Sequence, residues 1–223
     1  MEAMWGRLRD PGSYQAPQYF ITAAKWSADA VWRRLRAAIP ACTGVLVLDG
    51  TGFPKLGPAS VGVARHYSGT LGRVGNCQVA VTAALWTGVH AWLVGAQLYL
   101  PAMWLTPAQA ARAKIPDAVV FQEKWRQALT LLRQVRAAGI VLTAVVADAE
   151  FVDCTVLRRA LHAWALPYAL GVSAHLPVFL GPPRVQVPPA RMGRGRPASR
   201  PQLAAGVAPQ SLRAVAASAT ARA

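Results

Sequence analysis

Apolar and polar residues alternate in blocks along the chain, and these blocks predict strands and helices in a definite order. The run GVLVL, residues 44–48, is continuously apolar and ends on Asp49, which is typical of a strand covered on both faces. Two further apolar runs, roughly 77–86 and 90–99, flank Thr87-Gly88 and predict a hairpin of buried strands. We expect these three strands to be antiparallel neighbours, with a Gly/Pro-rich loop through residue 75 after the first.

The second half of the pattern alternates helices with strands. Residues 121–139 have apolar positions spaced by three and four and end at Gly139, which predicts a helix with a glycine C-cap. The run IVLTAVVADAEF, residues 140–151, predicts a strand that ends on Asp148; a helix over 153–165 and a strand over 167–172 follow. The whole order predicts an α/β fold with a mixed sheet.

The flanks of this pattern differ from its centre. Residues 1–40 are helical in parts, with Ser27 able to cap a helix that ends before Pro40. Residues 41–180 carry the predicted core. Residues 181–223 are rich in proline, glycine and arginine, and we interpret them as an exposed basic arm with a weak helix at the end. The run RMGRGRP, residues 191–197, is either a phosphate or minor-groove contact or a low-complexity linker.

The charge is strongly one-sided, since 24 Lys and Arg against 9 Asp and Glu give a formal charge of +15. Such a field attracts polyanions, and nucleic acid is the obvious partner, although membrane surfaces attract the same sign. A biased genome explains the excess of arginine over lysine but not the shortage of acids. Three widely spaced cysteines, at residues 42, 77 and 154, indicate reduced thiols in a cytoplasm.

A membrane span is the alternative interpretation of one segment. No formally charged residue lies between Arg73 and Arg112, and this stretch is longer than the roughly 20 residues that a helix needs to cross a bilayer. Its β-rich composition and the break at Thr87-Gly88 favour the hairpin instead. We therefore expect no membrane segment, and the start of the chain has no signal-peptide core.

Two aspartates, Asp49 and Asp148, end two apolar strands that we expect to be adjacent and parallel. Acids at the carboxyl ends of such strands meet in one crevice. Two neighbouring carboxylates repel each other unless a proton or a cation lies between them, and hard oxygen ligands select Mg2+ or Mn2+. A pair of divalent ions held in this way can activate water for phosphodiester cleavage. For a single aspartate after a strand, a turn or an N-cap is the commoner role.

Several motifs of this sequence together resemble a known family. These are DGTGFPK (residues 49–55), SVGVARHYSGTLG (60–72), GNCQVAV (75–81) and VVADAEFVD (145–153). Roughly residues 15–180 resemble bacterial insertion-sequence transposases with a DDE-type, ribonuclease-H-like catalytic domain. The resemblance implies that Asp49 and Asp148 are the first two catalytic acids and hold Mg2+ for strand nicking and for attack of a 3′-hydroxyl on target DNA. It further implies a nucleoid-associated protein of the bacterial cytoplasm, and a homo-oligomer is left open.

The sequence also departs from the family pattern. A second Asp is common where Gly50 stands, and a Gly-Tyr-Gly-like turn where AEFVD, residues 149–153, stands. The family takes its third acid from a downstream helix, whereas no Asp or Glu follows Asp153 here. We therefore expect a truncated or frameshifted transposase with little or no activity. Glu150 is a weak substitute for the third acid, because a turn or cap role is commoner for it and for Asp153.

Basic residues in and near the loop after the first strand are candidates for DNA contact. Lys55, Arg65 and Arg73, together with His66, can reach phosphates beside the cleavage site, and such contacts position DNA without reading its sequence. For each one, a solvated basic loop is an equally good interpretation.

Two rival functions are left open. The run VLDGT resembles part of the DxDGT motif of haloacid-dehalogenase phosphohydrolases, but Val47 then stands where the nucleophilic aspartate is required. The other rival is a basic remnant that binds DNA without cutting it.

Overall fold

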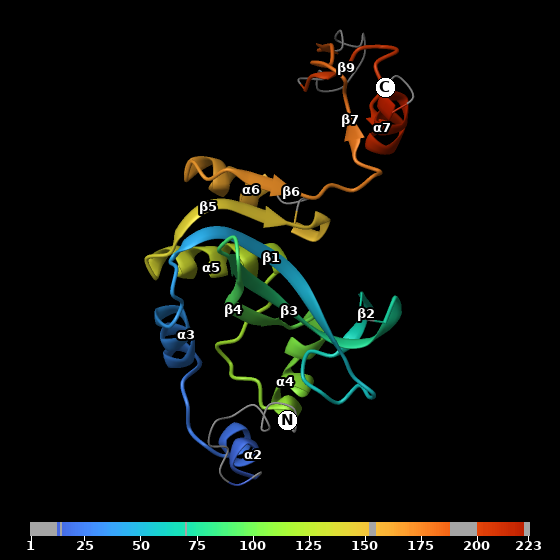
Figure 1. Ribbon diagram of the computed structural model, residues 1–223. Coiled ribbons are helices and arrows are strands. Elements are labelled where there is room, and N and C mark those ends of the chain that lie inside the picture. Colours follow the sequence, from blue (N-terminus) through green and yellow to red (C-terminus); the bar gives the residue numbers. More distant parts are fainter. Residues whose placement is uncertain (1–12, 14, 70, 152–154, 188–199, 221–223) are drawn as a thin grey trace.

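A mixed sheet forms the centre of the computed structural model, which describes residues 13, 15–69, 71–151, 155–187 and 200–220. The strands lie in the order β2-β3-β1-β5-β6, and β4 also pairs with β3 (Figure 1). The predicted α/β fold with a mixed sheet is confirmed, and the arrangement is compatible with a ribonuclease-H-like domain. The strands are β1 (Thr43–Pro54), β2 (Ala64–Ser68), β3 (Arg73–Trp86), β4 (Ala91–Tyr99), β5 (Val141–Ala147) and β6 (Tyr168–Leu170).

The pairing directions divide the sheet into two halves. β2, β4 and β1 are all antiparallel to β3, whose first part pairs with β2 and whose second part pairs with β4. β5 is parallel to β1, and β6 is parallel to β5. The prediction of three antiparallel strands followed by parallel ones is therefore confirmed.

Two details of the strand prediction are wrong. β1 does not end at Asp49 but continues to Pro54, because β3 pairs with it from Val45↔Trp86 to Pro54↔Cys77. Only its parallel pairing with β5 ends at Leu48. The predicted loop through residue 75 contains β2, and β3 already begins at Arg73, since the two strands form a short hairpin there.

Helices flank the sheet, and the longest described one, α5, is the helix that the apolar spacing predicts. Gly139 follows α5 with φ +80°, which suits a glycine C-cap. Ser27 caps α3, because its Oγ accepts a hydrogen bond from the backbone N–H of Ala30 at 3.3 Å. The pattern did not predict α4. The helices are α2 (Gln15–Thr22), α3 (Ala28–Ala37), α4 (Pro107–Ala113), α5 (Lys124–Ala137), α6 (Thr155–Ala163) and α7 (Leu212–Thr220), with 3-10 turns η1 (Ala102–Leu105) and η2 (Ala149–Phe151).

The hydrophobic core lies between the sheet and helices α5 and α6. Alternate residues of β1, Leu46 and Leu48, are buried there, and Phe151 of η2 is completely buried in the same cluster. Helix α3 is tied to this body by Arg36, whose Nε donates to the carbonyl oxygen of Val94 at 2.8 Å. The other fully buried members include Val81, Ala83, Leu85, Val94, Leu132, Val135, Val145, Leu157 and Leu161.

The end of the chain lies apart from the sheet. Figure 1 shows α7 and the short strands β7 and β9 beyond β6, in orange and red. The predicted weak terminal helix is present as α7, whereas the run 191–197 and Asp153 lie outside the described residues. None of the described helices is long and apolar enough to span a membrane. The short strands are β7 (Pro177–Val178), β8 (Val185–Gln186), β9 (Gln202–Leu203) and β10 (Gln210–Ser211).

Candidate active site

Asp49 and Asp148 occupy equivalent positions on two neighbouring parallel strands. The last parallel pair of β1 and β5 is Leu48↔Ala147, and the next residue of each strand is one of the two aspartates. Both side chains are exposed. The structure thus brings together two residues that are 99 positions apart in sequence, at the carboxyl end of the parallel pair.

The backbone at Asp49 is held by the antiparallel neighbour of β1. Thr82 lies directly opposite Asp49 on β3, and its hydroxyl donates to the Asp49 carbonyl oxygen at 3.2 Å. The hydroxyl oxygens of Thr51 and Thr82 are also 3.3 Å apart. Because side chains alternate along a strand, Asp49 and Thr51 share one face, and the buried Leu48 faces the core on the other.

The surroundings of Asp148 raise the pKa of its carboxyl group. Partial burial is the largest cause, and the negative charges of Glu150 and Asp49 raise the pKa further. The backbone N–H of Glu150, which donates to Asp148 Oδ1 at 2.9 Å, and the charge of Lys124 lower it. The two aspartates are therefore close enough for the charge of Asp49 to raise the pKa of Asp148.

The turn after Asp148 is packed tightly against the end of β6. Gly171 follows β6, and its N–H donates to the Ala147 carbonyl oxygen at 2.8 Å. A Cβ atom on Gly171 would lie 2.9 Å from the backbone nitrogen of Ala149 and 3.2 Å from the carbonyl carbon of Asp148. The absence of a side chain at residue 171 thus lets the strand end approach the turn that carries Asp148.

A second polar cluster lies beside Asp49 and Asp148, here called the acid pair, at the first turn of α5. Lys124 forms an ion pair with Glu150, and its Nζ also lies 5.2 Å from the centre of the Tyr99 ring. His66 packs its ring edge-on to Tyr99 at 6.1 Å, and its pKa is lowered by burial and by the positive charge of Lys124, against an opposing effect of Glu150. No sequence motif predicted this cluster, although a lysine at a helix N-terminus is unusual because it opposes the helix dipole.

The predicted DNA-contacting residues line a different part of the sheet. Lys55 follows β1 and donates its backbone N–H to Asn76 at 2.9 Å, and Arg65 of β2 is paired with the same asparagine. Arg73 begins β3, and all three cationic side chains are exposed. Lys55 is six residues beyond Asp49, or about 20 Å along an extended strand. These cations therefore extend away from the acid pair instead of surrounding it.

The residues present suit part of a divalent metal site. Two adjacent carboxylates offer hard oxygen donors, which are the ligands that Mg2+ and Mn2+ prefer. Within the described part of the chain, no group of three His, Cys, Asp or Glu residues is arranged to hold a metal ion. Asp49 and Asp148 can thus supply two ligand groups, and a complete coordination shell needs further donors.

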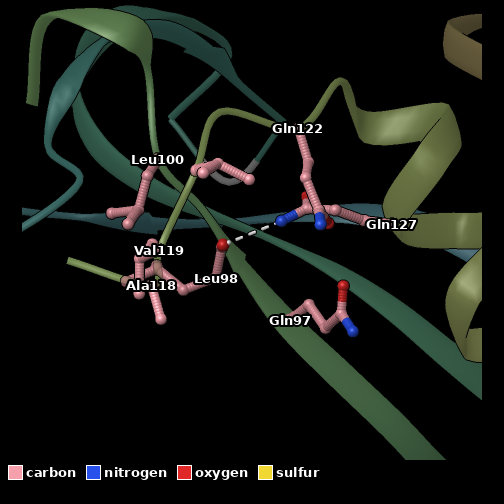
Figure 2. Close-up of a pocket in the computed structure, with 8 residues that line it drawn as sticks. Gln97, Leu98, Leu100, Ala118, Val119, Gln122 and Gln127 are labelled. Atoms are coloured by element: carbon pink, nitrogen blue, oxygen red, sulfur yellow. Dashed lines mark hydrogen bonds between the residues drawn. The ribbon is translucent and has the colours of Figure 1, made fainter. Parts of the chain in front are cut away.

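A pocket of about 400 Å³ beside β4 and α5 has a different character. Figure 2 shows its glutamine side chains, among which Gln127 Nε2 donates to the carbonyl oxygen of Leu98 at 3.0 Å. The buried Gln127 Oε1 has no hydrogen-bond partner among the described residues. No acid, histidine or cysteine lines this pocket, so the acid pair is the better candidate for catalysis. The lining residues are Gln97, Leu98, Leu100, Ala118, Val119, Val120, Gln122 and Gln127.

Comparison with known proteins identifies one family. No curated protein matches the sequence significantly. The sequence model of one protein family, described as DDE superfamily endonuclease, matches residues 1–223. Since the match extends over the full sequence, the chain belongs to the DDE superfamily of endonucleases.

Proposed function

We propose that this protein is a transposase-type nuclease whose Asp49 and Asp148 hold Mg2+ or Mn2+ for cleavage and transfer of DNA strands. The observation that supports the proposal is the register of β1 and β5, whose last parallel pair, Leu48↔Ala147, directly precedes the two aspartates. The negative charge of Asp49 raises the pKa of Asp148, which gives a reason for a cation between them, because a cation relieves the repulsion of paired carboxylates.

The metal would supply activation of the attacking water or hydroxyl and stabilisation of the leaving oxygen. The role of the chain's own residues is to fix the two carboxylates. Thr82 and the strand pairing hold the backbone of Asp49, and the N–H of Glu150 orients Oδ1 of Asp148.

The DNA would follow the basic edge of the sheet. Arg65 of β2, Arg73 of β3 and Lys55, which directly follows β1, are exposed, and the formal charge of +15 favours a polyanion in general. Contacts from these side chains to phosphates would set the position of the duplex relative to the acids.

The test is nicking of supercoiled DNA in Mn2+, comparing the wild type with Asp49→Asn and Asp148→Asn. We expect weak nicking that falls to background in both variants, since two carboxylates form only part of a metal site. Nicking that persists in both variants would contradict the assignment.

A second candidate function is DNA binding without cleavage. The observation that favours it is that no third acidic, histidine or cysteine side chain in the described residues joins the pair in a metal-binding group. It predicts DNA retention that needs no metal and weakens steeply with salt, without nicking under any metal condition.

A further inference from the structure

Glu150 lies where three parts of the molecule meet behind the acid pair: the turn η2, the start of α5 and strand β1. Glu150 belongs to η2, which follows β5 and Asp148. Its side chain contacts Lys124, the first residue of α5. The Lys124 side chain is only 17% exposed, compared with 38% for Glu150. This ion pair is therefore better shielded from water than an ordinary surface pair, and it ties the turn to the helix.

The Glu150 carboxylate also occupies the space beside Gly50 of β1. A Cβ atom on Gly50 would lie 2.5 Å from Glu150 Oε2, so a side chain at residue 50 requires the carboxylate to move. By strand alternation, Gly50 faces the same side as the buried Leu48, and Asp49 faces the opposite side. Glu150 thus lies behind the strand that carries Asp49, which agrees with the lack of a three-ligand group in the described residues.

The backbone of Glu150 acts on Asp148 directly. Its N–H donates to Asp148 Oδ1 at 2.9 Å, and the next residue, Phe151, is fully buried in the core. The position of this N–H therefore depends on how firmly η2 is held. The core holds η2 at Phe151, and Lys124 holds it at the Glu150 side chain.

We propose that the ion pair of Lys124 and Glu150 acts as a clamp that positions Asp148. The lack of a side chain at Gly50 of β1 leaves room for the Glu150 carboxylate. Glu150 is here a positioning residue and not a metal ligand. The proposal rests on the proposed function, because the clamp matters for activity only if Asp148 holds a metal ion.

The experiment transfers the carboxylate from one side of the contact to the other. The variants are Glu150→Gly, Glu150→Gln, Lys124→Met, Gly50→Asp and the double variant Gly50→Asp with Glu150→Gly. Residue 150 keeps its backbone N–H in all of them. Glu150→Gln and Lys124→Met change the tether alone, whereas Glu150→Gly also frees the backbone of the turn and Gly50→Asp displaces the carboxylate. The control is Arg126→Met, which breaks the exposed pair between Arg126 of the same helix and Glu123, the residue before it.

Two measurements test the clamp without a DNA-nicking assay. The first is Mn2+ affinity by calorimetry. We expect roughly 10-fold weaker binding in each single clamp variant and no change in the control, because outer-shell partners of metal ligands act on this scale. The double variant should not recover, because an aspartate at residue 50 can pair with Lys124 but leaves η2 without its side-chain tether; full recovery would show that the charge matters and the tether does not. The second is hydrogen exchange of the Glu150 amide, which should become faster in Lys124→Met and in Glu150→Gln.

The outcomes separate the clamp from the proposed function. If the wild type binds Mn2+ through Asp49 and Asp148 but the clamp variants bind equally tightly, the clamp is refuted and the metal assignment stands. If the wild type binds no Mn2+, the metal assignment fails, and unchanged exchange of the Glu150 amide in Lys124→Met would refute the clamp as well. Where Gly50→Asp fails to fold, Glu150→Gln and Lys124→Met decide the result.

Discussion

Gly171 lies so close to the turn after Asp148 that a Cβ atom there would stand 2.9 Å from the backbone nitrogen of Ala149. The nearby atoms belong to the backbone and not to a flexible side chain, so a methyl group at residue 171 must displace the turn. The residue after β6 therefore takes part in placing Asp148, the candidate metal ligand that follows β5.

Substitution of this glycine should disturb both stability and metal binding. We expect Gly171→Ala to lower the free energy of unfolding by about 1–3 kcal/mol, the usual cost of overpacking, and to weaken Mn2+ binding. Thermal unfolding and calorimetry measure the two effects. Gly181→Ala is the matched control, because no atom lies within 4 Å of a Cβ there. Equal behaviour of the two variants would contradict the close packing at Gly171.

The raised pKa of Asp148 predicts a gain in stability when its charge is removed. A carboxyl whose pKa is higher in the folded protein stabilises the fold below its unfolded value of 3.8, and this contribution is lost as pH rises through the folded value. Asp148→Asn keeps an oxygen that can accept from the Glu150 N–H. Near pH 7 we expect a higher melting temperature than that of the wild type, with the difference shrinking toward pH 4. A variant that is less stable at neutral pH would show that the charge is well compensated.

The lowered pKa of His66 predicts the opposite dependence of stability on pH, in the range below pH 6.5. Burial is the first cause of its lowered pKa, so the folded protein favours the neutral ring, and protonation favours the unfolded chain. Stability from His66 is complete above its unfolded pKa of 6.5 and decreases as pH falls toward the folded value. In His66→Phe, the loss of melting temperature between about pH 7 and pH 5 should be smaller than in the wild type. An unchanged slope would exclude His66 as its source.

The basic edge of the sheet predicts a change in the salt dependence of DNA binding. Each phosphate contact contributes about 0.9 to the slope of log K against log salt concentration. Lys55→Ala, Arg65→Ala and Arg73→Ala should each reduce the slope by roughly one unit and weaken binding to all sequences alike. Arg159→Ala on α6, also an exposed cation, serves as the control. Equal slopes for all four variants would place the DNA elsewhere.

The sequence predicted the parts of the site that a continuous apolar pattern defines. The runs before Asp49 and Asp148 are strands as predicted, so the meeting of the two aspartates followed from strand order. The expectation that the first strand is covered on both faces was wrong, since only alternate residues of β1 and β5 are buried. The apolar spacing of α5 identified the side of this helix that faces the core. The continuation of β1 through Gly50, Gly52 and Pro54 was missed because hydrogen bonds from β3 hold this segment, whereas its own residues favour a turn.

Contacts between distant side chains could not be predicted in the same way. Lys124 and Glu150 are 26 residues apart, and the helix pattern accounts for neither of them. The strand β2 was missed for a related reason. It is short and mostly not buried, and its pairing with β3 defines it better than its own residues do.

The unequal neighbours of β1 have a mechanical consequence. As far as Leu48 the strand is held from both sides, by β3 and β5, but from Asp49 to Pro54 only β3 is paired with it among the described residues. The first half should be stiff and the second half compliant, because backbone with fewer partners opens at lower free energy. Asp49 lies where the two halves of β1 meet. Movement of the compliant half can therefore tilt the Asp49 carboxylate while the stiff half keeps its position.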